Sequence, residues 1–165
     1  MISPHCVRAT LRDCCQRHSC VTNLLAIGQE TLLQRLFQEV VVPEPVWREL
    51  CAEHDRLPPF LRVVKLRDNS AIAQLAPSLD EGEAAAILLA QELHADYLLM
   101  DETAGRAEAI QRGLRVLGLL GVLQRAKECG MIARIKPLLV ALREDAGFWL
   151  SPDLVERVLR ESDEA

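Results

Sequence analysis

Four short apolar segments alternate with segments of helical pattern, and this alternation constrains the fold more than any other feature of the chain. The apolar segments are EVVV (39–42), LRVVK (61–65), DYLLM (96–100) and LRVLG (114–118). Short, continuously apolar strands separated by helices are typical of a parallel sheet covered by helices on both faces. We therefore expect one α/β domain with three layers, α/β/α, around a central parallel sheet. Ligands of such sheets bind beyond the carboxyl ends of the strands.

The segments between these strands carry recognisable helix boundaries. The clearest helix is predicted within 78–95, where Asp80 can cap the first turn and Glu83 can close a capping box. Ser151 as a cap and Pro152 in the first turn predict the start of the last helix. We expect the whole stretch from 119 to 147 to be helical as well.

Composition limits the class of protein. A chain of 165 residues, half of them hydrophobic, fits one domain with a single buried core. No apolar run approaches the roughly 18 residues that a membrane span needs, and the first residues lack the apolar stretch of a secretory signal. We expect a cytoplasmic protein without a membrane partner, whose six cysteines are reduced thiols.

Charge is distributed unevenly along the chain. The net charge of −5 argues against a general nucleic-acid binder. Residues 103–143, however, hold eight basic residues and only two acidic ones, which leaves −11 for the rest of the chain. Such asymmetry predicts a basic side that faces a polyanion next to an acidic site. The alternative is that each of these basic residues lies on an ordinary solvated helix surface.

Acidic residues follow strands or begin helices, where a parallel sheet can gather them. They are Glu49, Glu83, and Asp101 with Glu102. Carboxylates brought together repel one another unless a divalent cation lies among them, and such hard oxygen ligands suit Mg²⁺ or Mn²⁺. A metal held there can activate water and stabilise the charge that develops on a phosphodiester.

Each of these acids also has a purely structural interpretation. Glu83 could be no more than the partner of Asp80 in a capping box. Asp101 could cap the helix that follows it, and Glu49 could be a solvated helix residue. A carboxylate at the end of a buried strand is costly unless it is paired, which favours a functional role for Asp101.

Three long segments resemble, in order, a family of small prokaryotic PIN-domain proteins that are described as predicted nucleic-acid-binding proteins. They are NLLAIG…VWREL (23–50), LDEGEAAAI…CGMI (79–132) and PLLVALREDAGFWLS (137–151). The resemblance implies a PIN-like domain over residues 19–165, after an atypical segment, 1–18. PIN domains are Mg²⁺- or Mn²⁺-dependent ribonucleases, and many are the toxin of a toxin–antitoxin pair.

The family's motifs fall on Glu49, Glu83 and Asp101, which the resemblance makes catalytic and metal-binding, with Glu102 as a further metal ligand. It places Arg106 and Ser19 where nucleic acid binds, although Arg106 could equally form a fold-stabilising ion pair. The implied partners are RNA, a small antitoxin protein and a second copy of the chain. A structural or regulatory homodimer is a separate hypothesis, with a Leu-rich helix such as PLLVALRE as its interface, although one apolar helix face is more often core.

The family's remaining acid, at the end of the first strand, has no counterpart here. Alignment on Ser19 and Asn23 places Arg17 where the Asp of a VSDTS-type pattern belongs. The preceding TLRDCCQ makes a poor buried strand, so the first strand is in doubt, and Asp13 stands four positions too early. A positive charge about 4 Å from a dication repels it strongly in a water-poor site. We therefore expect either an impaired ribonuclease or an inactive PIN-fold protein that binds RNA or an antitoxin-like partner.

A frame-shifted or degenerate start would explain residues 1–18. The codons GAC TGC TGT CAG CGA CAC for Asp13 to His18, read one base later, spell Thr-Ala-Val-Ser-Asp-Thr, so sequencing the gene tests the idea. The rival interpretation is a zinc site. Its candidate ligands are His5, Cys6, Cys14, Cys15, His18 and Cys20. Adjacent cysteines depart from the usual Cys-x₂₋₄-Cys spacing, which favours ordinary thiols.

Overall fold

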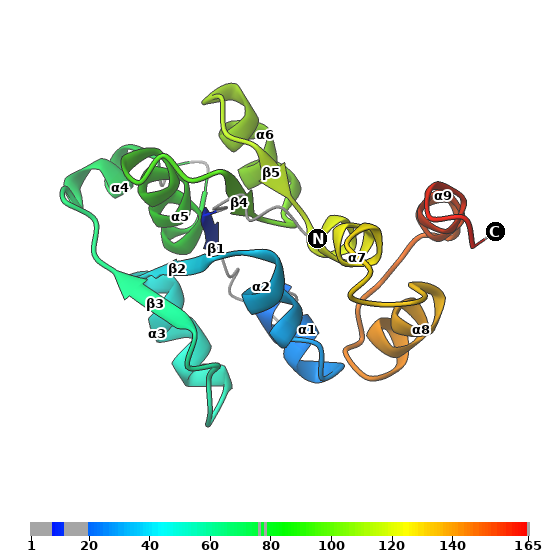
Figure 1. The fold of residues 1–165 in the computed structure, drawn as a ribbon. Helices are drawn as coiled ribbons and strands as arrows, with labels where there is room; N and C mark the ends of the chain where they lie inside the picture. Colours follow the sequence, from blue (N-terminus) through cyan, green and yellow to red (C-terminus); the bar gives the residue numbers. More distant parts are fainter. Residues whose placement is uncertain (1–7, 12–19, 76, 78, 165) are drawn as a thin grey trace.

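The computed structural model describes residues 8–11, 20–75, 77 and 79–164, and within them parallel strands form one sheet (Figure 1). The strands are β1 (Arg8–Leu11), β2 (Glu39–Pro43), β3 (Leu61–Val64), β4 (Tyr97–Leu99) and β5 (Val116–Leu117). Their order across the sheet is β3-β2-β1-β4-β5, and every neighbouring pair is parallel. All the carboxyl ends therefore lie on one edge, as the sequence predicts for this fold class.

Helices occupy most of the remaining described chain. They are α1 (Cys20–Ala26), α2 (Thr31–Leu36), α3 (Glu44–Glu53), α4 (Ser70–Leu75), α5 (Glu81–Glu92), α6 (Thr103–Gln111), α7 (Leu119–Glu128), α8 (Lys136–Glu144) and α9 (Pro152–Glu161). The capping of α9 by Ser151 is confirmed, since its hydroxyl accepts from the Leu154 N–H. None of the described helices is long and apolar enough to cross a membrane.

The stretch 119–147 is not one continuous helical segment. It contains α7 and α8, separated by residues 129–135. Gly130 adopts a φ of +68°, and its N–H donates to the Lys127 carbonyl at 2.8 Å, which ends α7. Pro137 then stands in the first turn of α8, where its missing N–H costs nothing. The apolar pattern hides this break because both helices bury leucines in the same core.

Alternate residues of the strands face two different cores, which gives the fold its three layers. Val40 and Val42 pack in a core with α1, α2, α3 and α7, whereas Val41 packs against α5 on the opposite face. In β4, Leu99 belongs to the first core and Leu98 to the core under α5 and α6. Figure 1 shows these two groups of helices on either side of the sheet, with α8 and α9 beyond α7.

Strand β1 is the element that the sequence leaves in doubt, and it lies at the centre of the sheet. It pairs with β2 on one side and with β4 on the other. Two neighbouring strands can hold a segment whose own strand propensity is weak. Leu11 is the register partner of Leu99, so β1 and β4 end at the same level. Along the sequence, Asp13 follows Leu11 by two positions, as Asp101 follows Leu99.

The expectations that rest on Asp13, Arg17, Ser19 and most of the cysteine–histidine cluster lie outside the described residues. Cys20 alone of that cluster is described, and it is buried at the start of α1. The frame-shift hypothesis and the boundary between 1–18 and 19–165 therefore remain predictions, which the sequence of the gene can test.

The carboxylate of Glu164 holds α7, α8 and the end of α9 together. It accepts hydrogen bonds from Lys127 Nζ at 2.7 Å, from the Ile135 N–H at 2.6 Å and from the Lys136 N–H at 3.0 Å. Its side chain is 4% exposed. Desolvation raises the pKa of this carboxyl, but the hydrogen bonds from Lys127 and the two N–H groups outweigh it and lower the pKa to about 2.

We predict that Glu164→Gln destabilises the fold in a pH-dependent way. Because the folded pKa lies below the ordinary value of 4.5, the charged form contributes stability above about pH 4.5, and this contribution is lost as pH falls toward 2. After allowance for solvent screening, the loss at pH 7 should be about 1–2 kcal/mol. Urea unfolding at pH 7, 4.5 and 3 measures it. Glu144→Gln, at an exposed ion pair, is the control, and a loss that stays constant with pH would contradict the prediction.

Candidate functional site

Asp101 lies just beyond the carboxyl end of β4. Its Oδ1 accepts a hydrogen bond of 2.9 Å from the N–H of Leu119, the first residue of α7, and its Oδ2 is buried. A carboxylate at a helix N-terminus is stabilised by the helix dipole. The alternative that Asp101 caps the next helix is wrong, because Glu102 occupies the N-cap of α6 and makes no side-chain capping bond there. Asp101 instead joins β4 to α7.

Glu83 uses one carboxylate oxygen for a structural purpose. Its Oε2 accepts from the Asp80 N–H at 2.9 Å, and Asp80 Oδ1 accepts from the Glu83 N–H at 2.7 Å, which confirms the capping box. The side chain is buried at 6% exposure. Its Oε1 faces α6 so closely that a Cβ on Gly105 would lie 2.9 Å away. The capping role therefore leaves the second oxygen directed toward the first turns of α6.

Arg106 brings a positive charge to Asp101. Its Nη1 donates to the Met100 carbonyl at 2.8 Å, at the end of β4. A Cβ on Gly118 would lie 2.6 Å from Asp101 Oδ1 and 3.1 Å from Arg106 Nη1, so the two charged groups lie against the same glycine. Among the described residues, Arg106 therefore bonds to a backbone carbonyl and does not form the expected fold-stabilising ion pair.

Glu49 and Glu102 occupy different environments. Glu49 lies on α3, which contacts α5, and its Oε2 is buried. Glu102 is exposed at the start of α6. Over the described ranges, no three acidic, histidine or cysteine side chains approach closely enough to form a metal-binding group. Glu83 thus faces Gly105 of α6, Asp101 lies just before α6 and bonds to α7, and Glu49 lies on α3, a neighbour of α5.

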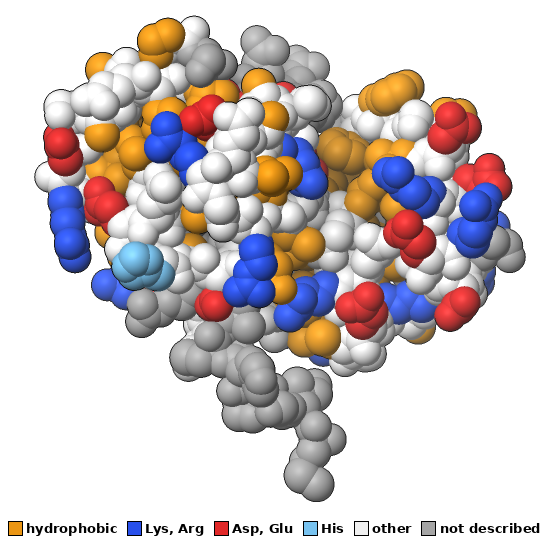
Figure 2. All heavy atoms as spheres, turned by 90° about the horizontal axis from the view of Figure 1, so that it is seen from above, with side chains coloured by type: hydrophobic (Ala, Val, Ile, Leu, Met, Phe, Trp, Pro, Cys, Tyr) orange, Lys and Arg blue, Asp and Glu red, His pale blue; other side chains and the backbone are white. Residues whose placement is uncertain are grey.

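Several basic residues of the stretch 103–143 form ion pairs in the fold. Five of its eight basic residues form ion pairs, which are Arg112–Glu108, Arg115–Asp96, Lys127–Glu164, Arg134–Glu164 and Arg143–Glu144. Arg115 and Arg125 also lie over the Tyr97 ring, each 5.1 Å from its centroid. Figure 2 shows acidic and basic side chains interspersed on the face of the molecule that it draws. These pairs offset part of the positive charge that the linear count gives to this stretch, and the basic side remains a prediction.

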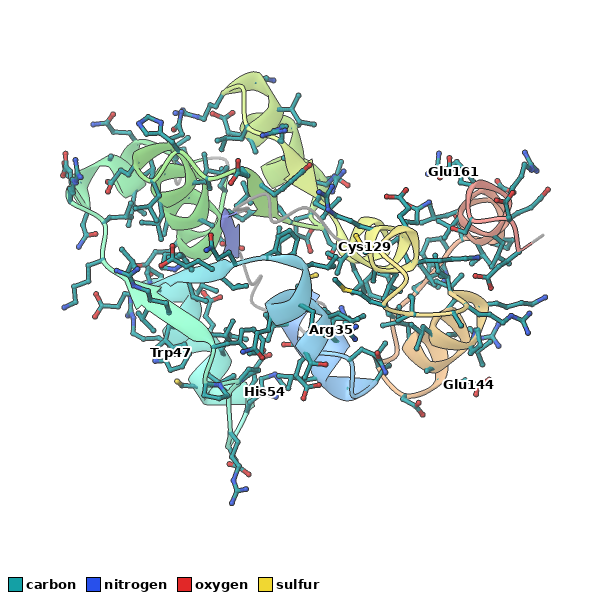
Figure 3. All side chains as sticks on the ribbon, in the orientation of Figure 1. Arg35, Trp47, His54, Cys129, Glu144 and Glu161 are labelled. Atoms are coloured by element: carbon teal, nitrogen blue, oxygen red, sulfur yellow. The ribbon has the colours of Figure 1, made fainter. Side chains whose placement is uncertain are left out.

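Asn23 is a buried polar residue that the sequence presents only as part of an NL motif. It is fully buried, and its side-chain amide has no hydrogen-bond partner in the part of the chain that the structure describes. Its neighbour Thr22 contacts His54, with 3.0 Å between Oγ1 and Nε2. Figure 3 labels His54 at the end of α3. A buried amide without a partner costs about 1–3 kcal/mol. A residue kept at that cost is a candidate for a role other than stability.

We predict that Asn23→Leu, which keeps the branched shape and removes both polar groups, raises the free energy of unfolding by about 1 kcal/mol. Urea unfolding of the two proteins checks it. If Asn23→Leu instead lowers the free energy of unfolding, by more than steric crowding from the leucine methyl groups explains, the Asn23 amide has a hydrogen-bond partner in the folded protein.

Grooves of the described surface differ in their relation to these acids. A groove of about 520 Å³ lies between α7 and the turn after α9, and an apolar one of about 650 Å³ between α8 and α9. A third, of about 250 Å³, lies between α3, α4 and the start of α5, at the carboxyl edge of the sheet.

In α8, the helix expected as a dimer interface, Leu139 and Leu142 are already buried in the chain's own core.

Among the described residues, a parallel sheet of five strands with helices on both faces defines an α/β protein with acidic residues after its strands. The chain belongs to the PIN-domain family, since a family model described as a PIN domain matches residues 18–164. PIN domains generally use divalent metals and bind nucleic acid. The match begins after β1, so it does not cover the central strand. No curated protein and no solved structure matches the chain.

The contacts of Gly118 and Gly105 are features of the site that the sequence does not reveal. Gly118 looks like the end of a strand and Gly105 like a small residue inside a helix. The close approach of Asp101 to one and of Glu83 to the other depends on packing between distant elements. Neither glycine stands near its acid in the sequence, since 17 positions separate Gly118 from Asp101 and 22 separate Gly105 from Glu83, so no local pattern indicates these contacts.

We predict that Gly118→Ala acts through Asp101. The backbone of Gly118, at φ −92° and ψ 175°, suits alanine, so the cost comes from the new Cβ against the carboxylate. The free energy of unfolding should fall by about 1–3 kcal/mol. In an Asp101→Ala background the same change should cost much less, because the obstructing carboxylate is gone. Equal costs in both backgrounds, measured by urea unfolding, would contradict this account.

Proposed function

We propose that this protein is a PIN-type endoribonuclease that depends on a divalent metal ion. Its acidic residues are Glu49, Glu83 and Asp101, with Glu102 as an outer ligand. The observation that supports this most is that both carboxylates lie beside α6: Glu83 Oε1 faces Gly105, and Asp101, two residues before α6, lies against the same glycine, Gly118, as Arg106 of α6. The chain itself has the PIN fold, which is a fold of nuclease type. The proposed setting is the toxin half of a toxin–antitoxin pair, which a neighbouring reading frame for a small DNA-binding protein would support.

The donor set fits Mg²⁺ or Mn²⁺, because it consists of carboxylate oxygens, and the oxygens Glu49 Oε2 and Asp101 Oδ2 are shielded from solvent. A bound ion would supply an activated water and stabilise charge on the phosphodiester. The chain's own backbone already orients two of the acids, through the Asp80 N–H on Glu83 and the Leu119 N–H on Asp101. Arg106, beside Asp101, is suited to position an RNA phosphate.

The second candidate is an inactive PIN-fold protein that binds RNA or an antitoxin-like partner without cutting. One observation favours it: the described residues do not assemble three ligands for an ion. The two candidates share the same fold and differ only in whether a metal-dependent step takes place.

We predict that the purified protein cleaves single-stranded RNA with Mg²⁺ or Mn²⁺ and stops when EDTA is added. Asp101→Asn and Glu83→Gln should each lower the rate about 100-fold or more, since each removes a charged ligand worth several kcal/mol in the transition state. Gel analysis of labelled RNA measures the rate. Glu108→Gln, which alters an acid of α6 that pairs with Arg112, should leave the rate unchanged.

The outcomes separate the two candidates. RNA binding without turnover in either metal would reject the nuclease and support the inactive binder. Cleavage that persists in EDTA, or in Asp101→Asn purified in parallel, would reject the proposed metal-dependent site.

A further inference from the structure

The groove of about 250 Å³ at the carboxyl edge of the sheet belongs to none of the acids discussed above. It is lined by Glu44, Pro45, Arg48, Leu66, Asn69, Ile72, Ala73 and Glu81. The β2 strand ends at Pro43, directly before α3, and β3 ends at Val64, just before Leu66. The groove therefore opens on the same edge as Asp101, on the β2 and β3 side of it.

Two of the three helices that border the groove, α3 and α5, also carry candidate acids. Arg48 precedes Glu49 on α3, and Glu81 precedes Glu83 by two positions on α5. Arg48 Nη2 lies 3.3 Å from Glu81 Oε1, with both side chains more than half exposed. An exposed pair of this kind adds little stability, so either partner can exchange its bond for one to a ligand.

The lining combines flat apolar surface with a small set of hydrogen-bonding groups. Leu66, Ile72 and Pro45 offer the apolar contact that the face of a base requires. Arg48 and Asn69 can donate, which suits the O6 and N7 acceptors of guanine. The Glu81 carboxylate can accept from the N1–H and the N2 amino group on the other edge of the same base. Guanine alone among the RNA bases offers two adjacent acceptors, O6 and N7, together with two adjacent donors, N1–H and N2–H, that one carboxylate can accept at once.

The size of the groove limits its occupant. At about 250 Å³ it is smaller than the roughly 300–1,000 Å³ of sites for drug-sized ligands, and a duplex could not present a base to it. Sequence-specific RNA recognition usually takes unpaired bases that are turned out of their stack. One nucleotide of a single strand is therefore the occupant that fits.

We propose that this groove binds the guanine of an unpaired nucleotide close to the phosphodiester that is cut. The link between this groove and cleavage rests on the proposed function, but the binding of guanine itself does not require a metal ion. Arg48, Asn69 and Glu81 are then the residues that determine which RNA sequences this protein prefers.

Binding is tested in EDTA with fluorescein-labelled oligouridine of nine nucleotides, with or without one central guanosine, by fluorescence anisotropy at fixed salt. The guanosine should strengthen binding about tenfold. Arg48→Ala and Glu81→Gln should abolish this gain. Inosine lacks the N2 amino group, so replacing the central guanosine by inosine should remove part of the gain in affinity in the natural protein. In Glu81→Gln the same replacement should leave the affinity unchanged.

Arg62→Ala is the matched control. Arg62 is as exposed as Arg48, at 67% and 65%, and also pairs with a glutamate, but that partner, Glu39, begins β2 at the opposite edge of the sheet. The guanosine gain should survive this change. Equal affinity for every base, a preference for adenosine, or an equal loss in Arg62→Ala would overturn the proposal.

Cleavage in Mg²⁺ separates this proposal from the proposed function. Cuts at a fixed distance from guanosine, which become unselective in Arg48→Ala, would support both. A guanosine preference in binding without any cleavage would leave the groove intact and reject the nuclease. Cleavage with the same base pattern in the natural protein and in Arg48→Ala would support the nuclease and reject the guanine-binding groove.

Discussion

The hydrogen bond between Asp101 and the N–H of Leu119 fixes the edge on which the candidate site lies. It joins the end of β4 to the start of α7, two elements separated along the chain by α6 and β5. Arg106 adds a second link from α6 back to the Met100 carbonyl. Because these bonds hold the strand end, the helix that follows it and the next helix in one arrangement, the carboxylate of Asp101 has a defined position before any ligand binds.

The acids of this edge combine structural and proposed functional roles, and the two roles use different oxygens. Glu83 closes the cap of α5 with Oε2 while Oε1 faces α6, and Asp101 binds α7 with Oδ1 while Oδ2 lies buried. In each acid a backbone N–H satisfies one carboxylate oxygen that is largely removed from water. The question whether Glu83 is a cap or a ligand therefore does not require a choice between them.

Much of the fold could be predicted from local pattern alone. The apolar segments 39–42, 61–65, 96–100 and 114–118 all contain strands, and the capping box of Asp80 and Glu83 is present. Strand β1 could not be identified, because it is held by pairing with β2 and β4 and not by its own composition. The charge count along the chain also omits partners such as Asp96 and Glu164, which come from outside the basic stretch and pair with part of it.

The sequence by itself determined the class of fold and the acids worth examining, because hydrophobic period and capping residues act over a few neighbouring positions. Only the tertiary structure decided what Asp101 caps, which glycines face Asp101 and Glu83, and that Arg48 meets Glu81 across two helices. Those contacts join residues far apart in the chain. Their geometry depends on how whole helices pack against the sheet, and no local pattern records it.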